Sequence, residues 1–418
     1  MTTQNTLQTI ISYLPVAAGM LLIASIPFYY GPLQRIALYA MAITYPLDYV
    51  VNRRWRNWHW DKRYWVYVAL LALFLMTPIR QLFDPTPPTP FFWRQFMLRV
   101  AFGVMGLAGL LGFSDRLRLH YVGYTMLAVS VGIFGYVLFL TGTHPNELYG
   151  DFLEQFNEWR RLRINSHMAL NLYMNVALIF GFYILNSPSR RWIKILTAVA
   201  MALIFTCLMF SQGRTGFITA LGILFVLGIY TISRYNKRLI LPTCLLIFAL
   251  SAVVVYFNQR LTREKFEGEP RWEIWDFSMS MVRERPLAGY GLSTLSCKYV
   301  ENMYADEVMN RRYIHGILDN PPFDTAPRTM ECIHPHNVFL ELQLENGLVG
   351  PLLYLLLFVL TAILCQRHRI YVWTSLLAIL TQSMFEPLGP HLLPMFIAVT
   401  IFVWTFCDRQ DVETIKIH

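Results

Sequence analysis

Residues 334–350 read HPHNVFLELQLENGLVG and pass from polar to strongly apolar side chains. The run ends a long hydrophilic stretch, residues 258–335, in a chain whose other long segments are mostly apolar. If those apolar segments cross a membrane, two histidines and an asparagine stand where the chain re-enters it. Polar side chains are costly at such a place unless they have partners or a function. We therefore expect chemistry at this entry point.

The rest of the chain has the composition of a polytopic membrane protein. It contains 418 residues, of which 55% are hydrophobic and 15% are charged. A membrane-spanning helix needs about 20 mostly apolar residues. Twelve such runs lie at 8–30, 34–51, 64–83, 97–113, 120–141, 166–186, 192–210, 215–233, 239–257, 340–364, 370–384 and 392–407. The sequence thus predicts an all-α membrane protein with one membrane domain over residues 1–418, and residues 258–335 form a large loop between the ninth and tenth spans.

The net charge of +9 reports topology rather than a nucleic-acid partner. Most of the surplus lies in five short segments at 53–63, 114–118, 190–194, 234–238 and 366–369. Twelve spans that alternate from a cytoplasmic N-terminus place all five segments on one side, which the positive-inside rule identifies as the cytoplasm. The large loop then lies on the exported, periplasmic face.

One segment of the large loop has a clear helical pattern. Residues 269–286 place apolar side chains at a spacing of three and four, and Pro286 ends the pattern. The expected apolar face consists of Ile274, Trp275, Ser278, Met281 and Val282. We predict an amphipathic helix that lies on the membrane surface or packs against the spans.

The remainder of the loop is less regular. The GYG triplet at 289–291 predicts a turn, and residues 300–333, which show no clear period, are expected to be irregular. Asn337 is expected to begin a helix that runs without a break into the tenth span, 340–364, where Gly347 permits close packing.

Arginines on the exported side are candidates for binding phosphate, because the planar guanidinium donates two parallel hydrogen bonds and keeps its charge. Arg214 lies in a tight turn between two apolar spans; the structural alternative is that it reaches lipid headgroups. Arg271 lies in the first turn of the loop helix, where a cation opposes the helix dipole unless Glu267, Glu269 or a bound anion lies nearby. Additional candidates, which solvation or a favourable helix dipole would also explain, are Arg163, Arg283 and Arg285. Arginines that converge from separate exported segments would form a clamp for the pyrophosphate of a lipid-linked glycan donor.

The two histidines suit proton transfer better than metal binding. His334 and His336 lack a third ligand at suitable spacing, and the exported loops contain no Asp-x-Asp, so we predict no metal. One imidazole fits as a general base that takes a proton from a sugar hydroxyl while the oxygen attacks. Interfacial hydrogen bonding is the structural alternative. Asn337 follows at the start of a helix, where backbone N–H groups favour negative charge.

Two of the six cysteines, Cys297 and Cys332, lie in the exported loop. Oxidation is permitted in that compartment, so a disulfide between them is an expectation based on compartment and an even count. The other four cysteines lie in spans or at their ends, where we expect small apolar packing.

Three places in the chain resemble the O-antigen ligase family and its sister group of lipid-linked glycan polymerases. Residues 334–350 resemble the family's His-Asn-x-x-Leu-x-x-x-x-x-x-Gly-x-x-Gly signature, and SQGRTG at 211–216 is similar to its Ser/Thr-x-x-Arg-Thr/Ala turn. PRWEIW at 270–275, followed by RPLAGYGL at 285–292, resembles its Arg-x-x-x-(Trp/Tyr) helix and Pro-x-x-Gly-x-Gly stretch. These motifs cover roughly the C-terminal half, and the N-terminal half matches only in its topology.

The resemblance implies roles for individual residues. His336, directly before Asn337, takes the position of the family's essential histidine and His334 does not, while Arg214 and Arg271 take those of its essential arginines. The implied enzyme is a GT-C-like glycosyltransferase in the bacterial inner membrane, with its active site on the periplasmic face. It would transfer a glycan from undecaprenyl pyrophosphate to a sugar hydroxyl of lipid A–core, with inversion and without metal, cofactor or ATP.

Two alternatives stay open. A polymerase would share this machinery and extend a lipid-linked acceptor, although the compact twelve-span plan with one large loop favours the ligase. A transporter of lipid-linked glycans fits the topology as well. Transporters usually place functional charges near the bilayer midplane and have repeated halves, whereas here the informative charges gather at the exported face.

Overall fold

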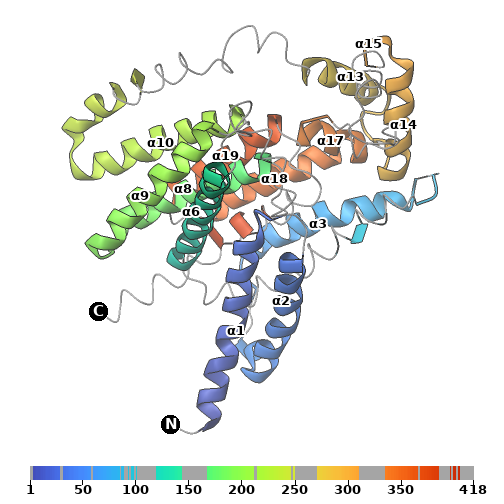
Figure 1. Cartoon of the computed structure of the whole chain (residues 1–418). Helices are drawn as coiled ribbons and strands as arrows, with labels where there is room; N and C mark the ends of the chain where they lie inside the picture. The colour runs from blue at the N-terminus through green and yellow to red at the C-terminus, as the bar shows by residue number, and fades with distance from the viewer. Residues whose placement is uncertain are drawn as a thin grey trace.

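The protein is built from helices that are joined by turns (Figure 1). The computed structural model describes residues 3–28, 32–57, 60–84, 86–88, 119–143, 167–210, 214–245, 271–309, 335–365 and 368–385, with short stretches at 93, 96–97, 100, 248–249, 396, 399–401 and 403–404. The longer helices are α1 (Thr3–Ser25), α2 (Pro32–Val51), α3 (Tyr64–Gln81), α6 (Leu119–Thr143), α8 (His167–Asn186), α9 (Arg191–Phe210), α10 (Arg214–Tyr235), α13 (Arg271–Glu284), α14 (Leu292–Ala305), α17 (Val338–Asn346), α18 (Val349–Leu364) and α19 (Arg369–Phe385). Three short helices are η1 (Arg54–Asn57), η4 (Lys237–Leu239) and α15 (Glu307–Met309). The expected all-α class is confirmed for this part of the chain.

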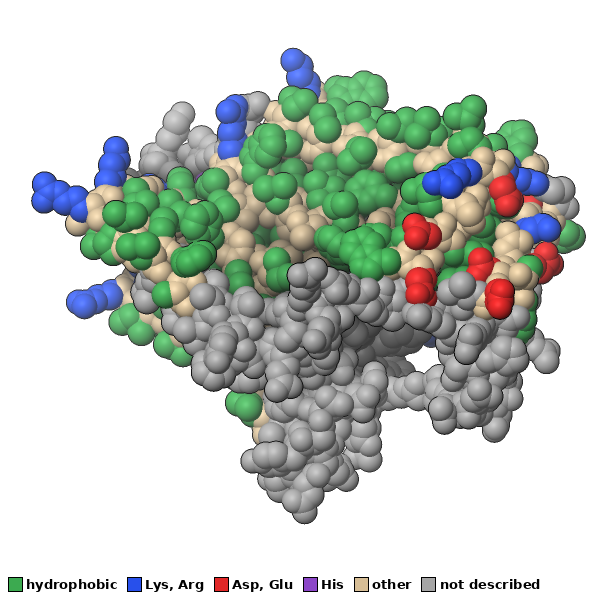
Figure 2. Space-filling view, turned by 90° about the horizontal axis from the view of Figure 1, so that it is seen from above, with side chains coloured by type: hydrophobic (Ala, Val, Ile, Leu, Met, Phe, Trp, Pro, Cys, Tyr) green, Lys and Arg blue, Asp and Glu red, His purple; other side chains and the backbone are tan. Residues whose placement is uncertain are grey.

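Several helices have the length and composition of membrane spans. Among the described residues, five helices qualify, namely α1, α3, α8, α9 and α10. Figure 2 shows apolar side chains over much of the described part of one face, with Lys and Arg projecting at its edges and Asp and Glu gathered at one side. Apolar surface of this extent suits contact with lipid. The protein is thus a membrane protein with several spans. The count of twelve stays a prediction, because the runs at 97–113 and 392–407 lie largely outside the described residues, and the run at 239–257 lies about half outside them.

Helix α8 forms the centre of the bundle. It packs against α6, α9, α10 and α19. Of its most apolar stretch of 18 residues 89% is buried, against 28% of the corresponding stretch of α9. Helices α8 and α10 run parallel. Asn175, in the first half of α8, donates to the Gly216 carbonyl near the start of α10 at 2.9 Å, and Asn186 at the end of α8 donates to the Thr231 hydroxyl near the end of α10 at 2.8 Å. Both helices therefore begin on the same side of the molecule, as the predicted topology requires for the sixth and eighth spans.

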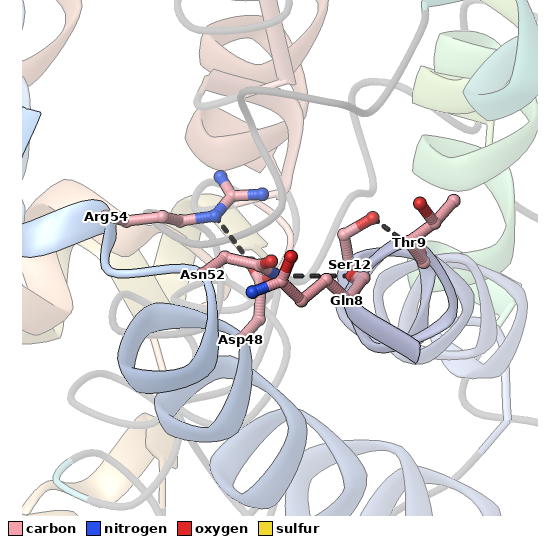
Figure 3. A network of polar contacts seen from close by, with 6 residues as sticks. All are labelled: Gln8, Thr9, Ser12, Asp48, Asn52 and Arg54. Carbon is pink, nitrogen blue, oxygen red and sulfur yellow. Dashed lines mark hydrogen bonds and ion pairs between the residues drawn. The ribbon is translucent and has the colours of Figure 1, made fainter. Parts of the chain in front are cut away.

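A polar network joins the α1–α2 hairpin to the first predicted cytoplasmic segment (Figure 3). Asp48 is fully buried on α2, and its carboxylate pairs with the Arg54 guanidinium at 2.7 Å. Asn52 donates to the same carboxylate at 2.6 Å and to the Gln8 carbonyl of α1 at 3.4 Å. A buried carboxylate is costly without such partners. Arg54 thus serves an internal ion pair within the basic segment.

The predicted tenth span is two helices rather than one. The expected continuous helix over 340–364 is wrong, because α17 ends at Asn346 and α18 begins at Val349. Gly347 lies between them with φ +65°, a backbone conformation that residues other than glycine rarely adopt. A Cβ at this position would overlap the Leu287 carbonyl oxygen. The expected close packing at Gly347 is therefore confirmed, and the packing partner is the loop that interrupts the helix.

This close approach makes Gly347 a sensitive position for stability. We expect Gly347→Ala to lower the stability of the folded protein by about 2 kcal/mol or more, because both the backbone conformation and the Leu287 contact become strained. Gly222→Ala is the matched control, since a Cβ on Gly222 of α10 meets open space. Thermal unfolding of the two purified variants in detergent tests this. Equal midpoints for the two variants would contradict it.

The large loop before α17 builds a second, smaller apolar core. Figure 1 shows α13, α14 and α15 gathered beside α17, and Ile274, Phe277, Met281, Tyr290, Leu295, Tyr299, Met303, Met309 and Leu344 form the buried cluster between them. The predicted helix over 269–286 is confirmed as α13. On its expected face Ile274, Ser278 and Met281 are buried, and Phe277 joins them.

The expectation of irregular structure over 300–333 is wrong for its first part. Residues 300–305 belong to α14, and α15 follows. Helix α14 buries Leu295, Tyr299 and Met303, which are spaced by four residues and so lie on one face. This helical spacing begins before residue 300, so residues 300–333 taken alone do not show it. Residues 310–333 lie outside the described part of the chain.

Candidate functional site

His336 lies at the junction between the large loop and α17. Its backbone is in the left-handed region, with φ +50°. Asn337 is the N-cap of α17, and its side-chain oxygen accepts hydrogen bonds from the N–H groups of Phe339 at 2.9 Å and Leu340 at 3.1 Å. Asparagine is among the preferred N-cap residues because it can satisfy the unpaired N–H groups there. Asn337 therefore has a structural role that places His336 directly outside the helix.

Helix α13 reaches the same junction through Trp275. The indole N–H of Trp275 donates to the Pro335 carbonyl at 2.8 Å. Arg271 is the first residue of α13, four positions before Trp275, so the two side chains share a face of the helix. The structure thus brings the helix that carries Arg271 to the residue that precedes His336. Sequence reasoning placed Trp275 on the apolar face and missed this contact.

The 286–291 turn docks on the C-terminal end of α17. The N–H groups of Tyr290 and Gly291 donate to the carbonyls of Leu344 at 2.8 Å and Glu345 at 2.9 Å. In return the Leu348 N–H donates to the Pro286 carbonyl at 3.1 Å. The predicted turn is confirmed, and its backbone forms hydrogen bonds with the segment that carries the His-Asn motif.

Helix α3 supports this turn from the other side. Arg80 donates to the carbonyls of Ala288 at 3.0 Å and Gly289 at 3.4 Å. Asp84 caps α14, because its carboxylate accepts the Thr294 N–H at 3.2 Å. A carboxylate is stabilising at a helix N-terminus. The N-terminal half of the chain thus contributes directly to the assembly of α13, α14 and α17, which no local sequence pattern indicated.

Arg283 and Arg285 lie at the opposite end of α13 from Arg271. At 1.5 Å per residue, Arg283 is about 18 Å further along the helix axis. Arg283 is exposed in the last turn, where a cation interacts favourably with the helix dipole. The Arg285 guanidinium stacks over the Tyr290 ring, 5.0 Å from its centroid. Arg283 therefore has the structural explanation considered above, Arg285 has a structural contact of its own, and a role of either residue in binding substrate stays a prediction.

Tyr290 anchors this end of the loop. Its hydroxyl donates to the Glu284 carboxylate at 2.6 Å and lies 3.2 Å from the Met281 carbonyl oxygen. Burial, with the hydrogen bond to Glu284, raises the pKa of Tyr290 above its usual value. The phenol therefore stays protonated and keeps its donor at physiological pH.

Arg214 is the first residue of α10, and neighbouring helices hold that end. Gly216 lies against Asn171 of α8, where a Cβ on the glycine would come within 2.6 Å of the Asn171 Cβ. The Gly216 carbonyl accepts the hydrogen bond from Asn175. Gly216 thus permits α10 to begin in contact with α8, and Arg214 stands at the end of that contact.

A chain of contacts places Arg214 on the same side of the molecule as His336. Tyr230 near the end of α10 contacts Tyr371 near the start of α19, with ring centroids 5.9 Å apart. Because the two helices pack together extensively, they run antiparallel, and the start of α10 lies at the end of α19. That end is Phe385, whose ring lies 5.8 Å from the Trp275 ring. The helix positions of Arg214, Arg271 and His336 therefore share one face of the bundle.

Other candidate residues lie outside the described part. These are His334, Arg163 and Cys332, together with the side chain of Cys297, whose backbone belongs to α14. The expected disulfide and the roles of His334 and Arg163 stay predictions. In the described ranges no three His, Cys, Asp or Glu side chains gather, and the expected independence from metal is likewise a prediction.

Comparison with known families supports the resemblance seen in the sequence. Residues 199–355 match the family model described as O-Antigen ligase. No curated protein matches the chain. The matched range includes α10, α13 and α17, and with them Arg214, Arg271 and His336. Together with the apolar helices, this domain indicates a membrane glycosyltransferase of the O-antigen ligase or polymerase type that acts on lipid-linked glycans.

Proposed function

We propose that the protein transfers a glycan from undecaprenyl pyrophosphate to a sugar hydroxyl of lipid A–core on the periplasmic face of the bacterial inner membrane. The observation that carries the proposal is the hydrogen bond from Trp275 to Pro335, because it joins the helix of Arg271 to the residue before His336. The match of residues 199–355 to the O-antigen ligase model supports the same reaction class.

In the proposed mechanism His336 is the general base. Its imidazole takes the proton from the acceptor hydroxyl as that oxygen attacks the anomeric carbon of the donor. The bond between this carbon and the pyrophosphate oxygen breaks in the same step, so a single displacement inverts the configuration. The proton resides on His336 and the electron pair leaves with the pyrophosphate.

Arg214 and Arg271 complete the proposed site. Charge develops on the pyrophosphate as the glycosidic bond breaks, and fixed cations stabilise that charge. Guanidinium groups suit this role because they donate paired hydrogen bonds to phosphate oxygens. Support comes from their positions at the starts of α10 and α13, on the face that also bears His336.

The acceptor distinguishes a ligase from a polymerase. The ligase proposal predicts that a bacterial strain lacking this protein makes lipid A–core without any attached glycan, because no transfer to the core takes place. Electrophoresis of the lipopolysaccharide, with staining for core and glycan, measures this. Core that carries a single repeat unit would instead identify a polymerase, and unchanged lipopolysaccharide would contradict both.

A further inference from the structure

We propose that Trp275 is a positioning residue for His336 and acts through the backbone of Pro335. The inference rests on the proposed role of His336 as the general base and extends it to a residue on another helix. Its basis is the hydrogen bond from the Trp275 indole N–H to the Pro335 carbonyl, at 2.8 Å. Indole is a donor only, so the direction of this bond is unambiguous.

The backbone of His336 needs support from both sides. A non-glycine residue with φ near +50° occupies a sparsely populated region, which persists where the surroundings hold it. On the C-terminal side, Asn337 is held by the two hydrogen bonds of its capping side chain. On the N-terminal side, Pro335 has no N–H to donate, and its carbonyl is held by Trp275. His336, which carries the imidazole, thus lies between two residues that are both held by hydrogen bonds.

Trp275 is itself held firmly enough to act as an anchor. Its ring lies between Trp272, with centroids 5.1 Å apart, and Phe385 at the end of α19, with centroids 5.8 Å apart. The same turn of α13 is anchored by Ile274 and Phe277, which belong to the second apolar core. The indole therefore connects α13, α19 and the His336 segment.

This arrangement predicts an effect on the rate rather than on substrate affinity. A general base must lie within hydrogen-bonding reach of the proton that it takes, and a displacement of about 1 Å can cost up to about 100-fold in rate. Trp275 is separated from His336 by a backbone carbonyl, so its loss should shift the imidazole without removing it.

The test is Trp275→Phe, which keeps an aromatic ring, removes the N–H donor and makes the side chain smaller. We expect kcat to fall about 10-fold, while KM for the lipid-linked donor changes by less than about twofold. Trp373→Phe is the matched control, because Trp373 on α19 is exposed and undergoes the same chemical change. A Trp275→Phe variant with wild-type kcat, or with its loss entirely in KM, would overturn the proposal.

A double variant separates positioning from general destabilisation. If Trp275 acts through His336, adding Trp275→Phe to His336→Ala should not lower the residual rate further. An additional 10-fold loss in the double variant would mean that Trp275 acts elsewhere, and the positioning role would be wrong.

Chemical labelling reports on the connection independently of activity. We expect diethyl pyrocarbonate to modify His336 about threefold faster in Trp275→Phe than in the wild type, because the segment loses its tether. His120 on α6 provides the reference peptide in the same mass spectrum. If Trp275→Phe leaves the labelling of His336 unchanged while His336→Ala is inactive, the positioning role is wrong and the proposed function stands. If Trp275→Phe speeds the labelling while His336→Ala is fully active, Trp275 does hold the segment, but His336 is not the general base.

Discussion

His336→Ala is expected to reduce kcat for glycan transfer by about 100- to 10,000-fold, the usual contribution of a positioned general base. Without the imidazole, the attacking hydroxyl must lose its proton to water, whereas the donor can still bind. Steady-state transfer of a labelled donor to purified lipid A–core measures the loss of rate.

The control for this substitution is another histidine. His120→Ala on α6 removes an imidazole that contacts Tyr183, with ring centroids 5.2 Å apart, and that plays no part in the proposed chemistry. We expect its rate to stay close to that of the wild type in protein of equal purity. Wild-type activity in His336→Ala would remove the histidine from the mechanism, and loss of donor binding in that variant would point to a role in recognition.

Arg271→Gln has the second large expected effect, a loss of about 100- to 1,000-fold in kcat/KM. The reason is that a fixed cation no longer stabilises the charge that develops on the leaving pyrophosphate. Arg271→Lys should recover only part of this loss, because an ammonium cannot form the paired hydrogen bonds of a guanidinium. Inhibition of transfer by inorganic pyrophosphate should weaken in parallel.

A charge-matched control decides whether position or net charge matters. Arg238→Gln removes one exposed cation from η4, beyond the far end of α10 from Arg214. We expect it to retain wild-type transfer and wild-type inhibition by pyrophosphate. If Arg271→Gln binds pyrophosphate as tightly as this control, the proposed clamp does not include Arg271.

Much of the fold followed from local patterns. Apolar runs predicted membrane helices, and α8, α9 and α10 begin and end within a few residues of the expected spans. The spacing of apolar side chains predicted α13, and the glycines at 289–291 predicted its following turn. Such patterns succeed because helix formation, amphipathic burial and turn conformation depend on residues that are close in sequence.

The break at Gly347 and the cap of α14 were not predicted, because both depend on segments far away in the sequence. The break at Gly347 depends on the Leu287 carbonyl, which belongs to a loop sixty residues earlier in the sequence. The cap of α14 depends on Asp84, 210 residues before Thr294. A continuous apolar run therefore reads as one helix until the packing partner is known.

By itself, the sequence determined that this is an all-α membrane protein and identified His336, Arg214 and Arg271 as candidates, because hydrophobic length and short motifs are local properties. The tertiary structure decided that the starts of α10 and α13 and the entry to α17 share one face. It also decided that Trp275 holds the residue before His336. These outcomes depend on hydrogen bonds and ring contacts between segments far apart along the chain, and only folding brings such segments within reach of one another.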